Sequence, residues 1–455
     1  MGKVLTEVRS SQGKLMPDIV GLESREQTDL RGIANKAKVA KQHRFQNLYR
    51  CLNAAFLLEC WHDLRKDAAS GVDGVTKESY AKDLHANLHA LVERLKRKQY
   101  RTKHVRRCHI PKGNGKERPL GIPALEDKLV QLACARLLGA IYEQDFLSCS
   151  YGYRPGRGAK EAVRELTHGL QFGNYGYVVE ADIKSFFDRL DHDWLLTMLE
   201  ERIDDRVFLN LIRKWLKAGI LESDGHLIHP KSGTPQGGNI SPILANVYLH
   251  YVLDLWVEKV VKPHCRGDVR IVRYADDWIC AFRFKGDADL FFRVLPKRLK
   301  KFNLELAREK TNILRFSRFH PGMRRWFCFL GFEFFWKEDR AGVPRVTRRT
   351  DRTKFQGACR RIKEWIRFNR HLPKRIFVAG LNRRLRGHYN YYGVYGNFAS
   401  IKRFYDWAKA CAFKWLNRRG GKRKSYNWPS FDEFCQHVGL ELPCITEVKR
   451  RCRVV

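Results

Sequence analysis

Two short apolar segments with acidic residues at their ends constrain the fold more than any other feature of the sequence. The first is Tyr177–Ile183, which contains Asp182. The second is Ile271–Cys280, in which Asp276 and Asp277 separate two runs of strand-forming residues. Two apolar strands joined by a tight turn form a hairpin, and adjacent aspartates in that turn project from its tip. The pattern therefore predicts a sheet that displays carboxylates at one end.

The chemistry of crowded carboxylates favours a metal site. Neighbouring carboxylates repel one another, and a bound dication removes that repulsion. Magnesium binds through a few carboxylates, water and substrate phosphates, so two-metal phosphoryl transfer is one interpretation. The alternative is that Asp276 and Asp277 only form a turn by bonding their own backbone, which is commoner for an isolated Asp-Asp pair. The pair by itself leaves both interpretations open.

The charge balance favours a polyanionic partner. The chain has 87 Lys and Arg against 49 Asp and Glu, a formal net charge of +38 that repels itself in a free compact chain. Basic residues run through the whole sequence, so nucleic acid fits better than a membrane surface. No segment approaches the roughly eighteen apolar residues of a membrane span. A ribosome-like scaffold or a merely solvated basic surface is the alternative.

Length and periodicity divide the chain into several units. A chain of 455 residues exceeds one compact core, and its 44% hydrophobic residues suffice for folding. The segments we expect are a flexible basic N-terminal extension (1–42), N-terminal helices with an extended hairpin between Val105 and Pro123 (43–175), an alternating strand and helix body (176–345), a helical basic segment (346–420) and a short basic tail suited to binding DNA (421–455).

The 346–420 segment predicts three amphipathic helices, because apolar residues recur there at helical spacing. Their other faces carry many cations and few acids, a pattern suited to the backbone of a nucleic-acid duplex. A solvated charged face is the alternative, but such a face normally mixes signs. The cations that we expect to bind RNA are Arg383, Arg384, Arg386, Lys402 and Arg403.

Six motifs follow one another in a fixed order, within a likeness that runs from roughly residue 43 to 428. They are Arg118–Pro123 (RPLGIP), Ser150–Arg157 (SYGYRPGR), Ala181–Asp188 (ADIKSFFD), Gly233–Gly238 (GTPQGG), Tyr274–Asp277 (YADD) and Phe329–Phe332 (FLGF). With these motifs the chain resembles bacterial group II intron-encoded reverse transcriptase/maturases. Any one motif alone is weak, whereas the ordered set is very specific.

The resemblance implies a metal site at the two acidic strand ends. Asp182 and Asp276 would bind two Mg²⁺ ions, with Asp277 beside them and the backbone carbonyl of Ile183 as a further ligand. All three aspartates are then implied to be catalytic, with manganese as the alternative metal.

The resemblance also implies nucleotide contacts from Lys112, Arg118, Phe187 and Gln236. Guanidinium suits phosphate, and whether Lys112 or Lys116 reaches the triphosphate stays open. Phe187 matches a steric gate that excludes a 2′-hydroxyl. A core role is the alternative for Phe187, since strand alternation buries one of two consecutive residues.

Template and primer contacts are implied for five further residues. They are Arg154, Arg157, Leu330, Gly331 and Lys310. The alternatives are a solvated surface role for the two arginines and a bent strand for the Leu-Gly pair.

Together these features predict an α+β right-hand polymerase, with fingers, a palm that bears the aspartates and a C-terminal all-α thumb or maturase domain. The expected function is RNA-directed DNA synthesis combined with intron splicing and retrohoming. The expected partners are an RNA template, in particular group II intron RNA, a DNA primer or target and dNTPs, in the bacterial cytoplasm and at the nucleoid.

Other roles remain open in this family. One alternative is a stand-alone polymerase in DNA repair or phage defence, and another is a splicing maturase with little polymerase activity. Fold resemblance does not separate them. The chain lacks the histidine and cysteine constellation of an HNH endonuclease, so we expect no second-strand cleavage from it.

Overall fold

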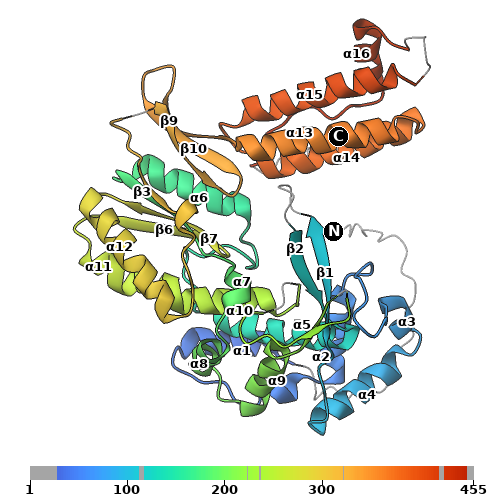
Figure 1. The fold of residues 1–455 in the computed structure, drawn as a ribbon, viewed down its shortest axis with the longest axis vertical. Helices are drawn as coiled ribbons and strands as arrows, with labels where there is room; N and C mark the ends of the chain where they lie inside the picture. The colour runs from blue at the N-terminus through green and yellow to red at the C-terminus, as the bar shows by residue number, and fades with distance from the viewer. Residues whose placement is uncertain are drawn as a thin grey trace, which may run out of the picture.

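The computed structural model describes residues 28–111, 117–222, 224–234, 237–320, 322–419 and 425–447. In these residues helices come first, helices and strands are then mixed from residue 105 to 350, and a helical bundle follows (Figure 1). This mixed arrangement agrees with the predicted α+β class. The described strands form three sheets, with strand orders β2-β1-β4-β5, β6-β7-β3-β8 and β11-β10-β9.

The first part of the chain is a helical layer built around α5 (Leu125–Tyr142). This helix is apolar on most of its circumference and is buried along its length, as expected of a helix in a core. The helices around it are α1 (Leu30–Val39), the 3₁₀ turn Leu48–Cys51, α2 (Ala54–Asp63), α3 (Lys77–Ala81) and α4 (Leu84–Lys96).

Helix α1 differs from the expected loose extension over residues 1–42. Asp29 caps its first turn, and Arg202 donates from its guanidinium to the carbonyls of Ala37 and Ala40 at the other end. Because these bonds satisfy the free groups of the helix ends, α1 is held against the helical layer. Residues 1–27 lie outside the described residues.

The hairpin predicted between Val105 and Pro123 is present. Strand β1 (Val105–Pro111) pairs antiparallel with β2 (Glu117–Ile122), and its tip, including Lys112 and Lys116, lies outside the described residues. Two short strands, β4 (Ile220–Leu221) and β5 (Leu227–Ile228), extend this sheet.

The central sheet consists of β3 (Tyr177–Asp182), β6 (Val269–Tyr274), β7 (Asp277–Phe282) and β8 (Asn312–Arg315). Alternate residues of its strands enter different cores, as strand geometry requires. Val178 packs with the buried face of α6 (Ala159–Phe172), whereas Val179 belongs to the larger core. Helix α12 (Lys285–Lys301) covers this second face (Figure 1).

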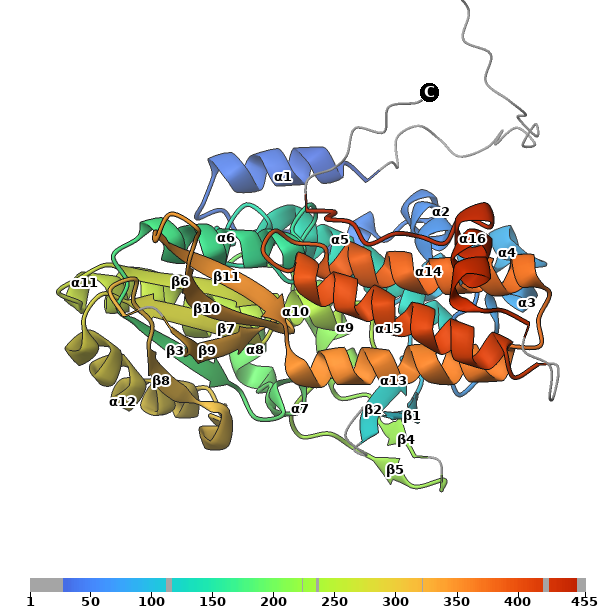
Figure 2. The same cartoon turned by 90° about the horizontal axis from the view of Figure 1, so that it is seen from above.

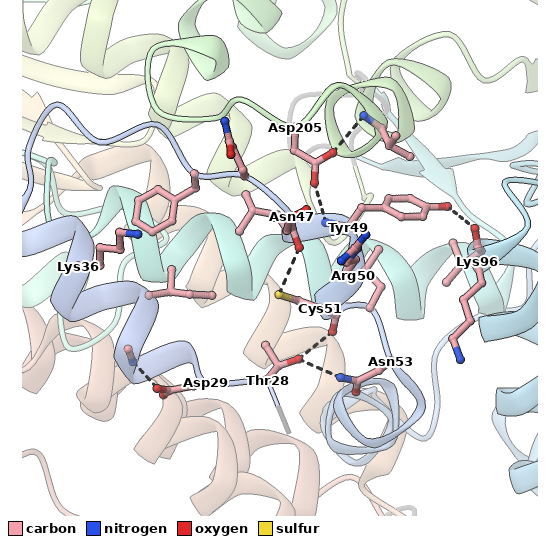
Figure 3. A pocket seen from close by; sticks show the side chains of 18 of the residues that line it. Thr28, Asp29, Lys36, Asn47, Tyr49, Arg50, Cys51, Asn53, Lys96 and Asp205 are labelled. Carbon is pink, nitrogen blue, oxygen red and sulfur yellow. Dashed lines mark hydrogen bonds between the residues drawn. The ribbon is translucent and has the colours of Figure 1, made fainter. Parts of the chain in front are cut away.

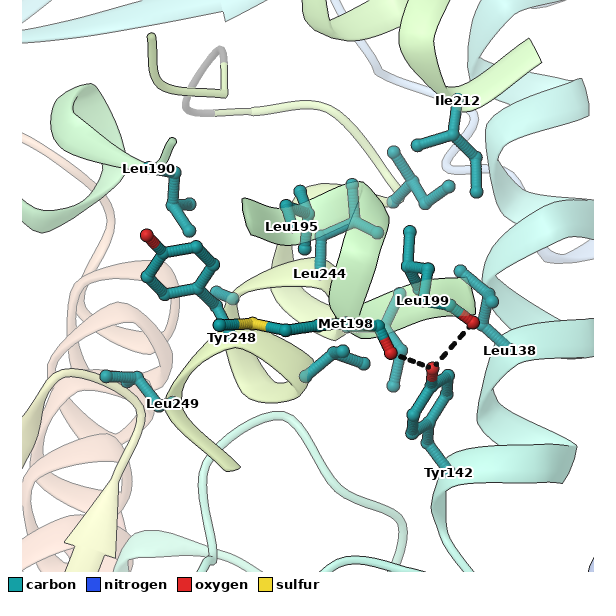
Figure 4. Packing of buried hydrophobic residues seen from close by; sticks show 14 of the residues in the cluster. Leu138, Tyr142, Leu190, Leu195, Met198, Leu199, Ile212, Leu244, Tyr248 and Leu249 are labelled. Atoms are coloured by element: carbon teal, nitrogen blue, oxygen red, sulfur yellow. Dashed lines mark hydrogen bonds between the residues drawn. The ribbon is translucent and has the colours of Figure 1, made fainter. Parts of the chain in front are cut away.

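The larger core continues between the sheet and the N-terminal helices. Leu138 and Tyr142 of α5 meet Met198 and Leu199 of α8 (His192–Glu200) there, with Tyr248 nearby (Figure 4). The remaining elements of this region are α7 (Phe186–Arg189), α9 (Arg206–Leu216), α10 (Ser241–Leu249), the π-helical turns His250–Asp254 and Val257–Val261, α11 (Lys262–His264) and the 3₁₀ turn Arg308–Lys310.

A second sheet connects the central sheet to the C-terminal bundle. It contains β9 (Gly322–Phe329), β10 (Phe332–Glu338) and β11 (Pro344–Thr350), and β11 leads directly into α13 (Arg352–Asn369) (Figure 2). The bundle continues with α14 (Lys374–Tyr392), α15 (Phe398–Leu416) and α16 (Trp428–His437). Buried Asn397 accepts from the Thr350 amide at 2.8 Å and donates to the Tyr392 carbonyl at 2.9 Å, which ties β11 to the bundle.

Two predicted features differ from the structure. Phe186 and Phe187 lie in helix α7 instead of a strand, because β3 ends at Asp182. Residues 428–437 of the expected basic tail form α16, whose Phe431 and Cys435 are buried in the bundle core. Within the described residues, no helix is long and apolar enough to cross a membrane.

A fully buried ion pair joins three distant segments beside the central sheet. Arg273 of β6 binds both carboxylate oxygens of Asp254 at 2.7 and 2.6 Å. It also donates to the Asn246 side chain, the Ser150 hydroxyl and the carbonyl of Ala275 at 2.8–3.0 Å. All three guanidinium nitrogen atoms of Arg273 donate hydrogen bonds here, as a buried charge requires.

We predict that Asp254→Ala destabilises the protein by about 3–5 kcal/mol, because it leaves Arg273 buried without its counter-ion. Glu165→Ala is the matched control, since Glu165 pairs with Arg270 of the same strand and both side chains are partly exposed. The control should cost less than about 1 kcal/mol. Urea denaturation measures both, and equal losses would contradict a special role of the buried pair.

Candidate active site

Asp182, Asp276 and Asp277 come together at one end of the central sheet. Asp182 ends β3 and lies opposite Asp277, the first residue of β7. Ala275 and Asp276 form the two-residue turn between β6 and β7, and Ala275 has the left-handed φ of 56° that tight hairpins use. Since opposite residues of paired strands point to the same face, the Asp182 and Asp277 carboxylates share one side of the sheet.

Crowding disfavours the ionised form of these carboxylates. Desolvation, together with the charges of Asp276 and Asp182, raises the pKa of Asp277 to about 7. Asp277 is exposed to solvent on one side. The desolvation comes from the protein atoms packed around the rest of its side chain. Burial also raises the pKa of Asp276, while Arg118 and Arg273 act in the opposite direction. The site therefore favours a bound cation at neutral pH.

Lys310 supplies one positive charge at this site. Its Nζ lies 2.5 Å from Asp182 Oδ2, and this bond raises the pKa of Lys310. Both side chains are partly solvent-exposed, so the pair is weak and can open when another cation approaches. Lys310 was predicted to contact primer or template, whereas here its contact is a carboxylate.

The donor set fits magnesium in an open site. Asp182 and Asp276 offer carboxylate oxygens, and the Ile183 carbonyl lies next to them in a short bridge to Leu306. The two bonds of that bridge run from the Ala307 amide to Asp182 and from the Lys184 amide to Glu305, so neither uses the Ile183 carbonyl. Among the described residues, no three His, Cys or acidic side chains close around one point. Few carboxylates with room for water and phosphate are what magnesium prefers.

The Ser150–Arg157 loop packs directly on the turn that holds Asp276. Ser150 forms a parallel bridge with Arg273, and a side chain at Gly152 would overlap the backbone of Ala275. The Gly152 carbonyl accepts from the Asn246 side chain at 2.7 Å. Glycine is therefore required where two backbones come this close.

Arg154 differs from the predicted template contact. Its side chain is buried, pairs with Glu143 at 3.0 Å and donates to the carbonyls of Leu147 and Ser150. Because these bonds occupy the guanidinium inside the loop, Arg154 does not project from the surface toward a template. Arg157 is half-buried and donates to the Ser148 carbonyl at 2.8 Å.

Phe187 follows Asp182 by five residues in the chain and packs on Phe186 and the Gly233–Thr234 backbone. Phe186 is buried in the core, while Phe187 stays partly exposed and packs against it edge to face. The Thr234 amide donates to the Phe187 carbonyl at 2.8 Å, and a side chain at Gly233 would meet the same carbonyl. The glycine-rich motif thus supports Phe187 through backbone contact, while Gln236 of that motif lies outside the described residues.

Leu330 and Gly331 form the tight turn between β9 and β10. Both have positive φ, 50° and 75°. The Leu330 amide acts on the Asp277 carboxylate and lowers its pKa, against the larger effect of burial. The turn predicted to contact the primer is therefore adjacent to the acidic site.

The five predicted RNA-binding cations are all exposed on the bundle, on α14 and α15. Arg384 lies 4.1 Å from the Trp365 ring, and Arg403 lies 5.2 Å from the Phe355 ring. Lys402 pairs with Asp406 across one helical turn. Surface contacts of this kind contribute little stability and can be exchanged for phosphate.

Three residues near the site were missed by the sequence analysis. Glu180 lies two residues before Asp182, and desolvation raises its pKa to about 7. Tyr153 is exposed, with Asp276 and Arg118 among its electrostatic neighbours. Tyr391 of α14 has Tyr274 and Asp277 among its electrostatic neighbours. Tyr153 lies within a motif, but only the folded chain brings Tyr391 to the aspartates.

A cavity of about 1080 Å³ lies away from the aspartates, between α1, the 3₁₀ turn and α4 (Figure 3). Asp29 and Asp205 line it, but their carboxylates already accept backbone amides. The cations around it, such as Lys36 and Lys96, are exposed surface residues. Its chemistry does not match that of the acidic site.

Comparison with known proteins identifies the central region. The family model described as reverse transcriptase (RNA-dependent DNA polymerase) matches residues 110–334. Protein YkfC of Escherichia coli (strain K12) is 33% identical over 311 residues, which cover 61% of this chain and 78% of YkfC.

Proteins of group II introns are also among the relatives. The group II intron-encoded protein LtrA of Lactococcus lactis subsp. cremoris is 37% identical over 209 residues, 45% of this chain and 34% of LtrA. The mitochondrial nuclear intron maturase 3 of Arabidopsis thaliana is 29% identical over 129 residues, 28% of this chain and 18% of that protein. The matched region is thus a minor part of both of these relatives.

The matched region contains the three aspartates, Arg118, Phe187 and the Leu330–Gly331 turn. The predicted family is confirmed: the chain belongs to the reverse transcriptases, the RNA-dependent DNA polymerases, and is related to group II intron-encoded proteins.

Proposed function

We propose that this protein copies RNA into DNA by two-metal nucleotidyl transfer at the site formed by Asp182, Asp276 and the Ile183 carbonyl. In this proposal the central sheet is the palm (176–345), the β1–β2 hairpin belongs to the fingers (43–175), and the helical bundle is the thumb (346–420). The β1–β2 hairpin and the bundle lie on the same side of the palm, which supports this assignment (Figure 1).

One observation carries the proposal. Asp182 and the Asp276–Asp277 pair are almost a hundred residues apart in sequence, yet antiparallel pairing of β3 with β7 brings them to one sheet end. The charge of Arg118, from the β1–β2 hairpin, acts on the Asp276 carboxylate. An acidic metal site beside a phosphate-binding arginine is the arrangement that phosphoryl transfer requires.

The residues of the chain position the reactants. Asp182 and Asp276 would hold the metal ions, with Asp277 beside them and close enough to the Leu330 amide for the amide to lower its pKa. Arg118 binds the triphosphate, and Phe187 lies against the sugar. Two bound Mg²⁺ ions, or Mn²⁺, would lower the pKa of the 3′-hydroxyl and neutralise the leaving pyrophosphate.

Asp276→Asn tests the metal site. The substitution keeps the turn but removes a charged ligand, so we expect kcat for primer extension on an RNA template with dNTPs and Mg²⁺ to fall by about a thousandfold or more. Asp224→Asn, at an exposed turn, is the control and should keep full activity. Extension by Asp276→Asn at a rate close to that of the wild type would contradict the assignment of Asp276 as a metal ligand.

Phe187→Ala tests the gate. Removing the ring should reduce discrimination against ribonucleotides by about 10- to 200-fold, the range that one apolar contact supplies. Single-nucleotide incorporation of dNTPs and NTPs measures the ratio of kcat/KM. Phe172→Ala removes an exposed ring from α6 and should leave the ratio unchanged. An unchanged ratio in Phe187→Ala would make Phe187 a core residue only.

We propose a second function for the exposed cations of the bundle, which is binding of group II intron RNA during splicing and retrohoming. The five cations on α14 and α15 and the relationship to an intron maturase support it. A repair or defence enzyme would keep the polymerase site without this RNA specificity. Cytoplasmic location, with DNA contact at the nucleoid, follows from the proposed substrates.

Replacement of Arg383, Arg384 and Arg386 by Gln tests this second function. If the three side chains contact phosphates, the magnitude of the negative slope of log K against log salt for structured RNA should decrease by about 2 to 3. The matched control replaces the same residues with Lys, which keeps the charge and should retain the slope. Filter binding over a salt series gives both values, and an unchanged slope in the Gln variant would exclude these residues from the RNA interface.

A further inference from the structure

We propose that Tyr391 is a positioning residue that couples the C-terminal helical bundle to the acidic site through Leu330. For its effect on catalysis the inference rests on the proposed function. The physical coupling itself belongs to the folded chain and can be measured without any reaction.

The first part of the coupling is the contact between bundle and turn. The Tyr391 hydroxyl, near the end of α14, donates to the Leu330 carbonyl at 3.0 Å. The Tyr391 ring stacks on Phe332, with ring centroids 6.1 Å apart and planes inclined by 11°. A movement of the end of α14 therefore acts on both sides of the Leu330–Gly331 turn.

The second part is the tight conformation of the turn. Leu330 holds a φ of 50° without being glycine, which costs energy unless the surroundings fix it. The Gly331 carbonyl accepts from the Asp351 amide at 2.9 Å, and a side chain at Gly331 would lie 3.2 Å from the Tyr392 hydroxyl. Asp351 caps α13 through its carboxylate. Two helices of the bundle thus hold one two-residue turn.

The third part is the contact between turn and active site. The backbone amide of Leu330 lowers the pKa of the nearby Asp277 carboxylate, and the carbonyl of the same residue accepts from Tyr391. Strand β9, which leads into Leu330, also contacts β7, which begins at Asp277. Asp277 pairs with Asp182 across the strands. Leu330 therefore lies between the bundle and the carboxylates, and a shift of α14 reaches the turn beside them through the Tyr391 hydrogen bond.

The position of the Tyr391 ring fits this role. The ring is 40% exposed, whereas its neighbour Tyr392 packs edge to face against Phe332 at 5.3 Å. Tyr391→Phe would remove the hydroxyl and keep the stacked ring. The variant therefore separates the hydrogen bond from the packing of the bundle.

Hydrogen exchange of the free, full-length protein tests the coupling directly. In Tyr391→Phe, amides of the 329–332 segment should exchange about two- to tenfold faster, the factor expected for loss of one hydrogen bond. Asp277→Asn should accelerate the same segment. Tyr395→Phe removes another exposed tyrosine hydroxyl just beyond α14 and should change nothing there. Unchanged exchange in Tyr391→Phe would overturn the proposal.

Primer extension adds the functional readout. Tyr391→Phe should lower kcat by a similar factor while the KM for dNTP and the melting temperature stay unchanged, because the hydroxyl contacts the turn and not the nucleotide. A loss of melting temperature with an equal loss in all kinetic constants would reduce Tyr391 to a structural role. If the wild type shows no extension, the proposed polymerase function fails, and the exchange measurement still decides the coupling.

Discussion

The buried pair of Arg273 and Asp254 is the interaction on which the acidic site depends. Arg273 is the residue before Tyr274 at the end of β6, and its guanidinium binds the carbonyl of Ala275 in the turn that carries Asp276. The same side chain binds Asp254, Asn246 and Ser150. A buried guanidinium must satisfy its donors, so each of these groups has one favourable position. The turn conformation is thereby fixed from the interior of the protein before any substrate arrives.

A π-helical turn directly after α10 brings Asn246 and Asp254 to the same guanidinium. Eight residues separate Asn246 from Asp254, and in an ideal α-helix this spacing leaves an offset of about 80° between side chains. The wider π-helical turn His250–Asp254 takes up that offset, so both side chains reach Arg273. π-helical turns are often found at functional sites, and here the turn supports the site from behind. Stability and placement of the carboxylates are consequently linked in this part of the molecule.

Sequence reasoning identified the parts of the site that depend on local pattern. The hairpin with Asp276 in its turn follows from apolar alternation around an Asp-Asp pair, and the β1–β2 hairpin follows from its glycine-rich tip. Arg154 shows where such reasoning fails, because the sequence does not tell whether an arginine side chain is exposed or buried. Its environment of Glu143 and two loop carbonyls exists only after residues 143–157 have folded back on themselves. The strand alternation considered for Phe186 and Phe187 does not apply, because both residues lie in helix α7 beyond the end of β3.

The sequence by itself determined the family, the presence of an acidic hairpin and the strongly basic surface, because these depend on the identity and order of residues. The tertiary structure decided which residues meet. Three such contacts are the pairing of Asp182 with Asp277, the hydrogen bond from Tyr391 to Leu330 and the buried bonds of Arg273 to Asp254 and Ser150. The residues that meet in them are 19 to 123 positions apart in the sequence. Contacts over such separations are set by the packing of whole elements, and no local pattern encodes them.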